Sequence, residues 1–370
     1  MGSKYQKSLR ISLPFWALIL EIALILVFFF FTSYETPSKK LKLLKTYPAF
    51  QDINVMAVLG LGFLNASLRR YTWSGVAFNL FTLALGVQWA IILDGFQFSF
   101  FSRKIPINIQ RIILGTMSAM SVLISSGAIL GKVNLVQMIV MTLLEVTVFR
   151  GAMMLTLNFL DGKEYESMMQ IHVFGAYFGV AVAWCLSGPE LNAAKEKERR
   201  ATTSSLFTTL GTLFLWIFWP TFNSALLDQP SEKETAVYNT YYALAASSVA
   251  AMSLSAATHS DGKISMECLN RTIGLHDTCE VHSTFGLPAL LGGLTYIMLE
   301  IEQASWASFS GVGFQVLVLA SPLSLFMAMG LVGGVLTGVI LRLNLWKAPP
   351  AAKYFDDQAF WEFPHLAVGF

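Results

Sequence analysis

Long apolar stretches recur along the chain, and short polar segments separate them. About ten stretches are long enough to enter or cross a bilayer, which takes roughly 20 apolar residues on a helix. They lie at residues 12–31, 53–68, 74–94, 111–130, 134–157, 168–187, 205–227, 237–257, 284–301 and 313–343. We therefore predict an all-α polytopic membrane protein, with one transmembrane domain over residues 1–343 and a C-terminal tail over 344–370.

The composition supports this prediction. Of the 370 residues, 55% are hydrophobic and 13% are charged, and a soluble domain has about twice that charged fraction. The net charge of +2 points to no particular partner and gives no indication of nucleic-acid binding. The three cysteines are too few for a disulfide framework. The apolar run at 11–32 has no small-residue cleavage site, so we interpret it as a retained first helix.

Lysine and arginine are enriched on the cytoplasmic side of membrane proteins. The distribution here favours a cytoplasmic position for both termini, although the lysines at 39–45 then fall outside. The inner segments would hold residues 69–70, the charged run 195–200, Lys347 and Lys353. The sequons at Asn65 and Asn270 would also face the cytoplasm, so we expect neither to carry N-glycan.

One ionisable side chain lies inside an uncharged run. His172 belongs to the stretch 168–186, and a histidine there is costly unless it faces the protein interior or a water path. Gly175 and Gly179 follow at i+3 and i+7, on much the same helical face. We expect these glycines to allow the close approach of a neighbouring helix.

Three further charges lie within predicted spans: Glu21, Glu145 and Arg150. Glu145 and Arg150 are five residues apart, so they do not face each other on one helix. We expect each to meet a partner on another helix. Structural pairing is the more common reason for such charges, and a role in conduction is the alternative.

Two other helices carry distinctive residues. In the span 205–227, Pro220 bends an aromatic-rich helix just before the polar pair Asn223 and Ser224. Such a stripe more often serves packing, but the bend and the polar pair favour a pore-lining role. In the last span the glycines at 330, 334 and 338 form a small-xxx-small ladder, which we assign to helix packing.

The segment 276–282 carries two histidines and a cysteine at intervals of three, which one helical face could present to a metal. No fourth ligand or second ligand pair accompanies them, so we predict neither a metal nor another cofactor. Nucleotide-binding and nucleophile motifs are also missing from the sequence, and we expect a protein that is not an enzyme.

Several segments resemble the Rh blood-group polypeptides of the ammonium transporter/Rh family. They lie at 1–5, 74–89, 130–134, 222–225, 238–242, 346–358 and 363–370. No sequon falls in a predicted outer loop, and in this respect the chain is similar to the non-glycosylated erythroid branch of the family. The resemblance implies about twelve spans for a full-length member of the family. Two of these helices normally lie between the segments 262–265 and 268–271, so this chain resembles a variant that lacks two helices.

The resemblance implies a trimer whose protomers each contain a narrow apolar pore for ammonium or ammonia, with carbon dioxide as a further candidate. His172 matches the first pore histidine, in Ile-His-x-Phe-Gly-Ala-Tyr-Phe-Gly, and His282 matches the second, in Asp-Thr-Cys-x-Val-His. Phe222 matches a vestibule phenylalanine. Glu164 stands where the family has an aspartate that supports ammonium recruitment. A carboxylate and an aromatic face attract a cation, and imidazoles exchange protons near neutral pH.

The sequence also departs from the family pattern. Ser126 stands where a second gate phenylalanine is expected, Glu280 replaces a glycine, and 283–285 reads Ser-Thr-Phe instead of Asn-Leu-His. The missing helices would interrupt the second half of the inverted repeat that builds the pore.

An alternative function therefore stays open, that of a non-conducting structural and antigenic subunit of a red-cell membrane complex. The resemblance implies an erythroid plasma-membrane location, association with an Rh-associated glycoprotein, and a membrane-skeleton adaptor at the tail.

Overall fold

The computed structural model describes residues 8–34, 40–98, 104–160, 163–188, 198, 202–258, 277–303 and 309–362. Most of the charged run at 195–200, the sequon residue Asn270 and His276 lie outside these residues. The all-α prediction is confirmed, because helices carry nearly all of the described structure and the sheet is limited to two short strands.

The first half of the chain contains η1 (Ser8–Ser12), α1 (Leu13–Phe31), β1 (Thr32–Tyr34), α2 (Lys40–Val55), η2 (Met56–Leu61), α3 (Gly62–Leu64), α4 (Thr72–Phe98), β2 (Ile105–Ile107), α5 (Ile109–Ile129), α6 (Leu135–Phe159), α7 (Glu164–Met169) and α8 (Ile171–Leu186). The second half contains α10 (Thr202–Ser224), α11 (Pro230–Thr258), η4 (His282–Gly286), α12 (Leu287–Gln303), α13 (Phe309–Leu341), η5 (Asn344–Trp346), η6 (Ala351–Lys353) and η7 (Asp357–Ala359).

Within the described residues, eight helices are long and apolar enough to cross a membrane. They correspond to eight of the ten predicted spans. The other two stretches, at 53–68 and 237–257, lie largely in helices, but these helices are not apolar enough to count as membrane spans. The first leaves the helix after Leu64. The second lies in α11, where serine, threonine, asparagine and tyrosine interrupt the apolar residues.

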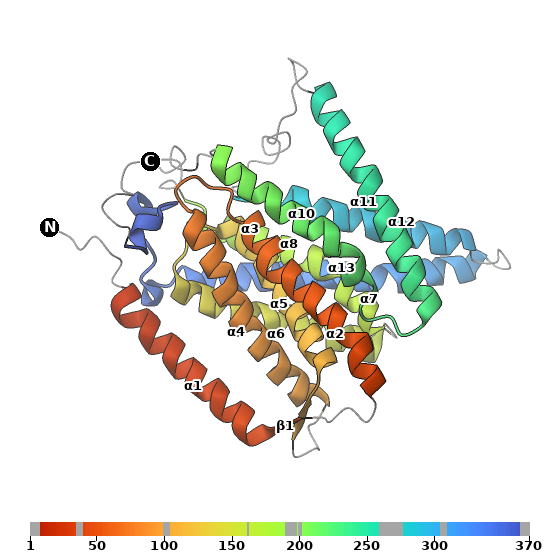
Figure 1. Cartoon of the computed structure of the whole chain (residues 1–370), viewed down its shortest axis with the longest axis horizontal. Coiled ribbons are helices and arrows are strands. Elements are labelled where there is room, and N and C mark those ends of the chain that lie inside the picture. The colour runs from red at the N-terminus through yellow and green to blue at the C-terminus, as the bar shows by residue number, and fades with distance from the viewer. Residues whose placement is uncertain are drawn as a thin grey trace.

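Helix α8 runs through the centre of the bundle (Figure 1). Its glycines let α5 approach, as predicted: a Cβ on Gly175 would lie 2.7 Å from the carbonyl oxygen of Ser121, and one on Gly179 would lie 2.6 Å from the Cα of Ser125. Helix α13 packs on another side of α8 through the glycine ladder. There a Cβ on Gly334 would lie 2.5 Å from the carbonyl oxygen of Phe178. The packing role assigned to that ladder is therefore confirmed.

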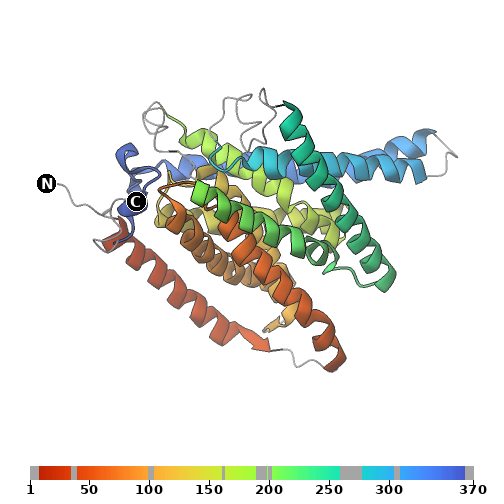
Figure 2. The same ribbon diagram turned by 45° about the horizontal axis from the view of Figure 1, so that its top comes forward.

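Helices α1 and α11 lie at the edges of the bundle (Figures 1 and 2). The apolar side chains of α1 are mostly exposed, which suits a helix that faces lipid. Helix α11 packs chiefly on α10, where the Asn223 amide donates to the hydroxyl of Thr240 at 3.0 Å. The indole of Trp216 donates to Ser248 at 3.1 Å in the same interface.

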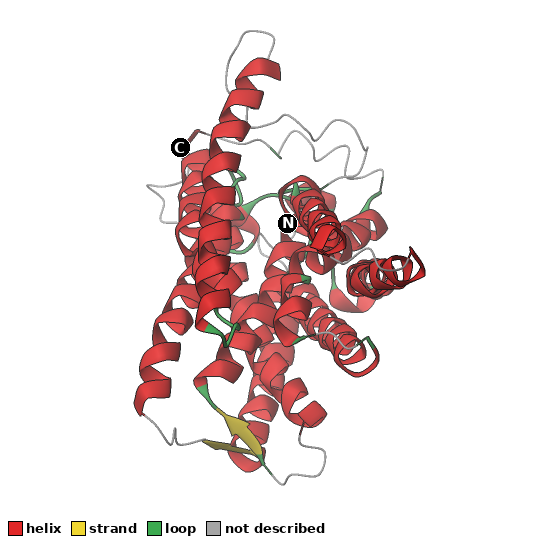
Figure 3. Cartoon of the chain, turned by 90° about the vertical axis from the view of Figure 1, so that its right-hand side faces the viewer, coloured by secondary structure: helices red, strands yellow, loops and turns green. Residues whose placement is uncertain are grey.

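The two strands form a small parallel sheet at one end of the bundle (Figure 3). Thr32 pairs with Ile105 and Tyr34 with Ile107. The sheet therefore joins the end of α1 to the start of α5.

The C-terminal segment, residues 344–362, folds back onto the bundle at the end where α4 begins. Asp357 accepts hydrogen bonds from the backbone N–H groups of Trp73 and Ser74, at 2.9 and 2.8 Å, and so caps α4. Burial raises the pKa of the Asp357 carboxyl, while these hydrogen bonds oppose the shift. The ring of Trp346 meets that of Trp16, with centroids 6.3 Å apart. The beginning and the end of the described chain therefore lie at the same end of the bundle (Figure 1).

Candidate functional site

His172 lies one residue after α8 begins, and its imidazole is surrounded by aromatic rings. The indole of Trp219 lies 5.3 Å away, with the ring planes at 24°. Phe222 meets the imidazole edge-on at 5.8 Å, and Phe285 lies nearly parallel to it at 6.1 Å and 17°. The Nδ1 atom lies 3.4 Å from the carbonyl oxygen of Met169. The imidazole therefore contacts α10 and η4, whereas Gly175 and Gly179, further along α8, contact α5.

Helix α10 brings its aromatic residues to His172 at the turn that contains Pro220. Phe222 is fully buried, and its ring centroid lies 6.3 Å from that of Trp219. Between them in sequence, the hydroxyl of Thr221 donates to the carboxylate of Asp52 on α2 at 2.8 Å. The aromatic stripe thus lines the surroundings of His172, whereas Asn223 turns to α11. The pore-lining role of this stretch stays a prediction.

His282 begins η4, the element that also carries Phe285. Its backbone N–H donates to Asp277 Oδ2 at 2.8 Å, and its half-buried ring meets the ring of Tyr177 at 5.8 Å and 69°. Tyr177 follows His172 along α8, whereas Phe285 follows His282 along η4. Because the ring pairs are His172 with Phe285 and Tyr177 with His282, the two elements run antiparallel. Both histidines lie at the interface of α8 and η4, but each ring has other neighbours.

Glu164 begins α7, the short helix that precedes α8, and its side chain is half-buried. The carboxylate lies within range of the positive charges of Arg150 and Arg111 and of the negative charge of Asp228. The carboxylate of Glu164 therefore interacts electrostatically with two arginines, Arg150 and Arg111.

The charges within the spans pair with other helices, as predicted. Arg150 on α6 forms an ion pair with Asp94 on α4, and both side chains are 3% exposed. Glu145 accepts a hydrogen bond from the Ser125 hydroxyl on α5 at 2.5 Å. Glu21 on α1 accepts from the amide of Gln88 on α4 at 3.3 Å. These pairs support structural roles for the charges, because each joins two helices.

A buried polar network occupies the region of the expected second gate ring. The hydroxyl of Ser126 lies 3.4 Å from Asn79 Oδ1, and the same oxygen accepts from the amide of Asn65 at 3.3 Å. Asn65 is 3% exposed, so its side chain is inaccessible to glycosylation in the folded chain. Ser126 thus belongs to a polar network between helices. The two rings that lie nearly parallel to the imidazole of His172 come from Trp219 and Phe285.

Glu280, which replaces a family glycine, has a φ of 56°. This left-handed conformation suits glycine and strains most other residues. Its backbone carbonyl accepts from the N–H of Thr284 at 2.9 Å, so the turn leads directly into η4. A glycine at position 280, as in the family pattern, would adopt this conformation without strain.

Metal-ligating side chains do not gather into groups of three in the part of the chain that the structure describes. His276, one member of the possible triplet considered from the sequence, lies outside that part. Among the residues that the structure describes, Cys185 and Cys279 form no disulfide.

Comparison with known proteins identifies the family. The model of the Ammonium Transporter Family matches residues 16–270 and 263–352. The chain belongs to this family. An RH-like protein of Macaca mulatta is 51% identical over 418 residues, and the human Blood group Rh(CE) polypeptide is 46% identical over 417, with 100% of both chains covered in each case. These relatives place the chain in the Rh branch of the family.

Solved structures agree on the fold. The Rh50 protein of Nitrosomonas europaea, which belongs to the Rhesus protein family of channels, superposes with a TM-score of 0.73 at 24% identity, over 90% of this chain and 94% of that one. A sensor Amt protein gives a TM-score of 0.63 at 16% identity, over 84% and 95%. The fold is therefore that of Rh and Amt proteins.

The interrupted match agrees with the missing helices inferred from the Rh resemblance. The two segments matched by the family model overlap at residues 263–270, the place where the sequence predicts the loss. The alignment with the macaque relative extends over 418 residues, whereas this chain has 370.

Sequence reasoning did not identify three neighbours of the histidines. Trp219 belonged to a stripe that we interpreted as pore lining, but its stacking on His172 could not be read from the pattern. The sequence marks Phe285 only as part of the segment 283–285, which differs from the family pattern. It marks Tyr177 only as one residue of the motif that contains His172. Periodicity could have placed Tyr177 on α8, but it does not encode how η4 lies against that helix.

Proposed function

We propose that this Rh-branch protein carries ammonium or ammonia across the membrane through a pore that contains His172 and His282. The observation that carries the proposal is the position of His172 inside the helical bundle, with Trp219 and Phe222 against its ring and the segment of the second histidine packed on the same helix. An ionisable group at such a place is a functional-site candidate by default.

The chemistry follows from the cost of moving ions. An ammonium ion loses several kcal/mol of hydration when it enters a dry site, whereas neutral ammonia loses far less. We propose that ammonium is held outside the buried ring of Phe222 and gives its proton to water there, and that ammonia then passes the imidazoles. Each neutral imidazole can donate from one nitrogen and accept at the other, so it can hold or relay a proton.

Glu164 would support recruitment of the cation in this scheme. Its charge is shared with Arg150 and Arg111, which weakens the field that it presents to ammonium. We therefore expect Glu164 to contribute to the apparent affinity for the cation rather than to the passage of ammonia. Carbon dioxide remains a further candidate substrate, because it is neutral and could use the same apolar path.

A non-conducting role is the second candidate function, and one observation favours it. The family match is interrupted at 263–270, beside the segment that leads to His282. In this role the chain would be a structural and antigenic subunit, associated with an Rh-associated glycoprotein and joined to the membrane skeleton through its tail. In both roles we propose a homo- or hetero-trimer in the erythroid plasma membrane, with both termini cytoplasmic.

Uptake of labelled methylammonium by cells that express the chain tests the first candidate. The His172→Ala variant should lose the uptake, because the imidazole that handles the proton is removed. Thr284→Ala is a matched control on η4, where the side chain is exposed. Size-exclusion chromatography should show that both variants fold. Unchanged uptake by a folded His172→Ala variant would contradict the twin-histidine pore.

A further inference from the structure

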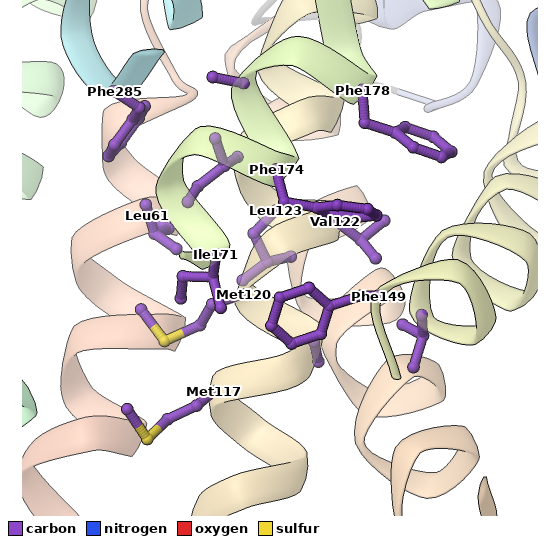
Figure 4. Packing of buried hydrophobic residues seen from close by; sticks show 14 of the residues in the cluster. Leu61, Met117, Met120, Val122, Leu123, Phe149, Ile171, Phe174, Phe178 and Phe285 are labelled. Atoms are coloured by element: carbon purple, nitrogen blue, oxygen red, sulfur yellow. The ribbon is translucent and has the colours of Figure 1, made fainter. Parts of the chain in front are cut away.

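Phe285 lies against the ring of His172, with the two ring centroids 6.1 Å apart. Its side chain is 7% exposed, and its ring is nearly parallel to that of His172. In Figure 4, Phe285 and Leu61 lie on one side of α8, whereas Phe178 lies on the other. Phe285 belongs to the same buried cluster as Phe149 and Phe326, and within that cluster it is one of the residues whose ring lies against the imidazole.

The backbone of η4 holds this ring in position. Val281 is 1% exposed, and a Cβ on Gly127 of α5 would lie 2.9 Å from its Cγ2, so the start of η4 is packed tightly. The N–H of His282 is held by Asp277. A Cβ built at Gly286 would lie 3.3 Å from that of Ala176, so the end of η4 lies in close contact with α8. Phe285 is thus fixed at both ends of its element.

The two histidines occupy different levels of the interface. His282 meets Tyr177, more than one helical turn along α8 from His172, and Phe285 occupies the level of His172 itself. We propose that Phe285 is a constriction residue that closes the path between His172 and His282 and sets the access of small molecules to the His172 ring. This inference rests on the proposed pore.

The physical basis is the character of the phenylalanine ring. It offers no hydrogen-bond partner to water, and a narrow apolar constriction can close a pore by dewetting. The rings of Trp219 and Phe222 already cover His172 from α10, and Phe285 covers the side that faces η4. On this proposal a smaller side chain at 285 uncovers that side of the imidazole, whereas another large ring keeps it covered.

Accessibility of position 172 tests the inference without requiring transport. A His172→Cys variant is made in a background in which the three native cysteines are replaced by alanine, and it is reconstituted in nanodiscs. The rate of reaction with methyl methanethiosulfonate is then compared for Phe285, Phe285→Ala and Phe285→Trp. We expect the alanine variant to react at least about 10-fold faster, and the tryptophan variant to react no faster than the parent.

Two further variants keep the test decisive. Leu287→Ala removes an apolar side chain that is 42% exposed just after η4, and it should leave the reaction rate unchanged. Phe285→Leu replaces the alanine variant if that one elutes as aggregate, and it should give an intermediate rate. Equal rates for Phe285 and for a folded smaller variant would overturn the constriction.

Ammonia flux through the same substitutions, with His172 intact, separates the two proposals. A higher flux in Phe285→Ala together with faster cysteine reaction supports both. Faster reaction with no flux in either protein supports the constriction and contradicts transport. Flux in the parent with unchanged cysteine reactivity contradicts the constriction alone.

Discussion

The backbone N–H of Phe355 donates to the carbonyl of Gly131 at 3.0 Å, and the Phe355 ring is fully buried. This contact fixes the C-terminal segment to the turn between α5 and α6. Gly131 has a φ of 83°, and a Cβ there would lie 2.3 Å from Cδ1 of the Phe355 ring. The position therefore requires glycine both for its conformation and for its space.

Gly131→Ala should detach the tail. The left-handed conformation costs about 1–2 kcal/mol for a residue with a Cβ, and the methyl group would also displace the Phe355 ring. Limited proteolysis should cleave the segment 344–362 faster in this variant. Gly151→Ala is the control, because a Cβ there meets nothing within 4 Å. Equal cleavage of the two variants would argue against the contact.

Lys132, the next residue, should make stability depend on pH. Burial lowers its pKa from 10.5 to about 8, although Glu198, Asp277 and Cys279 attract the charge. Between these two values the unfolded chain binds more protons than the folded one. The free energy of unfolding should therefore increase as the pH rises through this window, by about 3 kcal/mol.

The Lys132→Met variant should lose that part of the pH dependence. Unfolding in detergent at pH 7 and pH 10 measures it, as the difference between the parent and the variant. The same change with pH in both proteins would show that the ammonium group is not the source.

The ion pair between Asp94 and Arg150 predicts a non-additive double-mutant cycle. Asp94→Leu alone leaves a buried guanidinium, and Arg150→Met alone leaves a buried carboxylate. Each should cost about 3–5 kcal/mol, whereas the double variant should cost much less. Thermal unfolding in detergent gives the four values. Additive losses would mean that the two side chains act independently.

Glu280→Gly should stabilise the protein, because glycine adopts the left-handed conformation without the strain of a Cβ. We expect a gain of about 1 kcal/mol in the free energy of unfolding. Glu280→Gln removes the charge and keeps the Cβ, so it should give little of this gain. An equal gain from both variants would assign the effect to the charge.

The helical bundle could be predicted from the sequence, and so could several contacts within it. Apolar length placed the spans, and the glycines at 175, 179 and 334 gave the close helix contacts. The spacing of Glu145 and Arg150 required partners on other helices, and Ser125 and Asp94 are those partners.

The candidate site was less accessible to prediction. Resemblance supplied His172, His282, Phe222 and Glu164 as candidates, and their roles stay predictions. The stacking of Phe285 on His172 depends on how η4 lies across α8, which periodicity does not encode. The capping of α4 by Asp357 likewise joins residues that are more than 280 positions apart. Local sequence patterns carry no signal for a contact at that distance.

Stopped-flow measurement of ammonia flux in proteoliposomes tests the central claim most directly. The chain is compared with its His172→Ala variant, with empty liposomes, and with a version that restores the two missing helices. The account predicts flux above that of empty liposomes for the chain and a loss of this flux in the variant. Flux equal to that of empty liposomes, while the restored version conducts, would contradict the pore in this chain and favour the structural subunit.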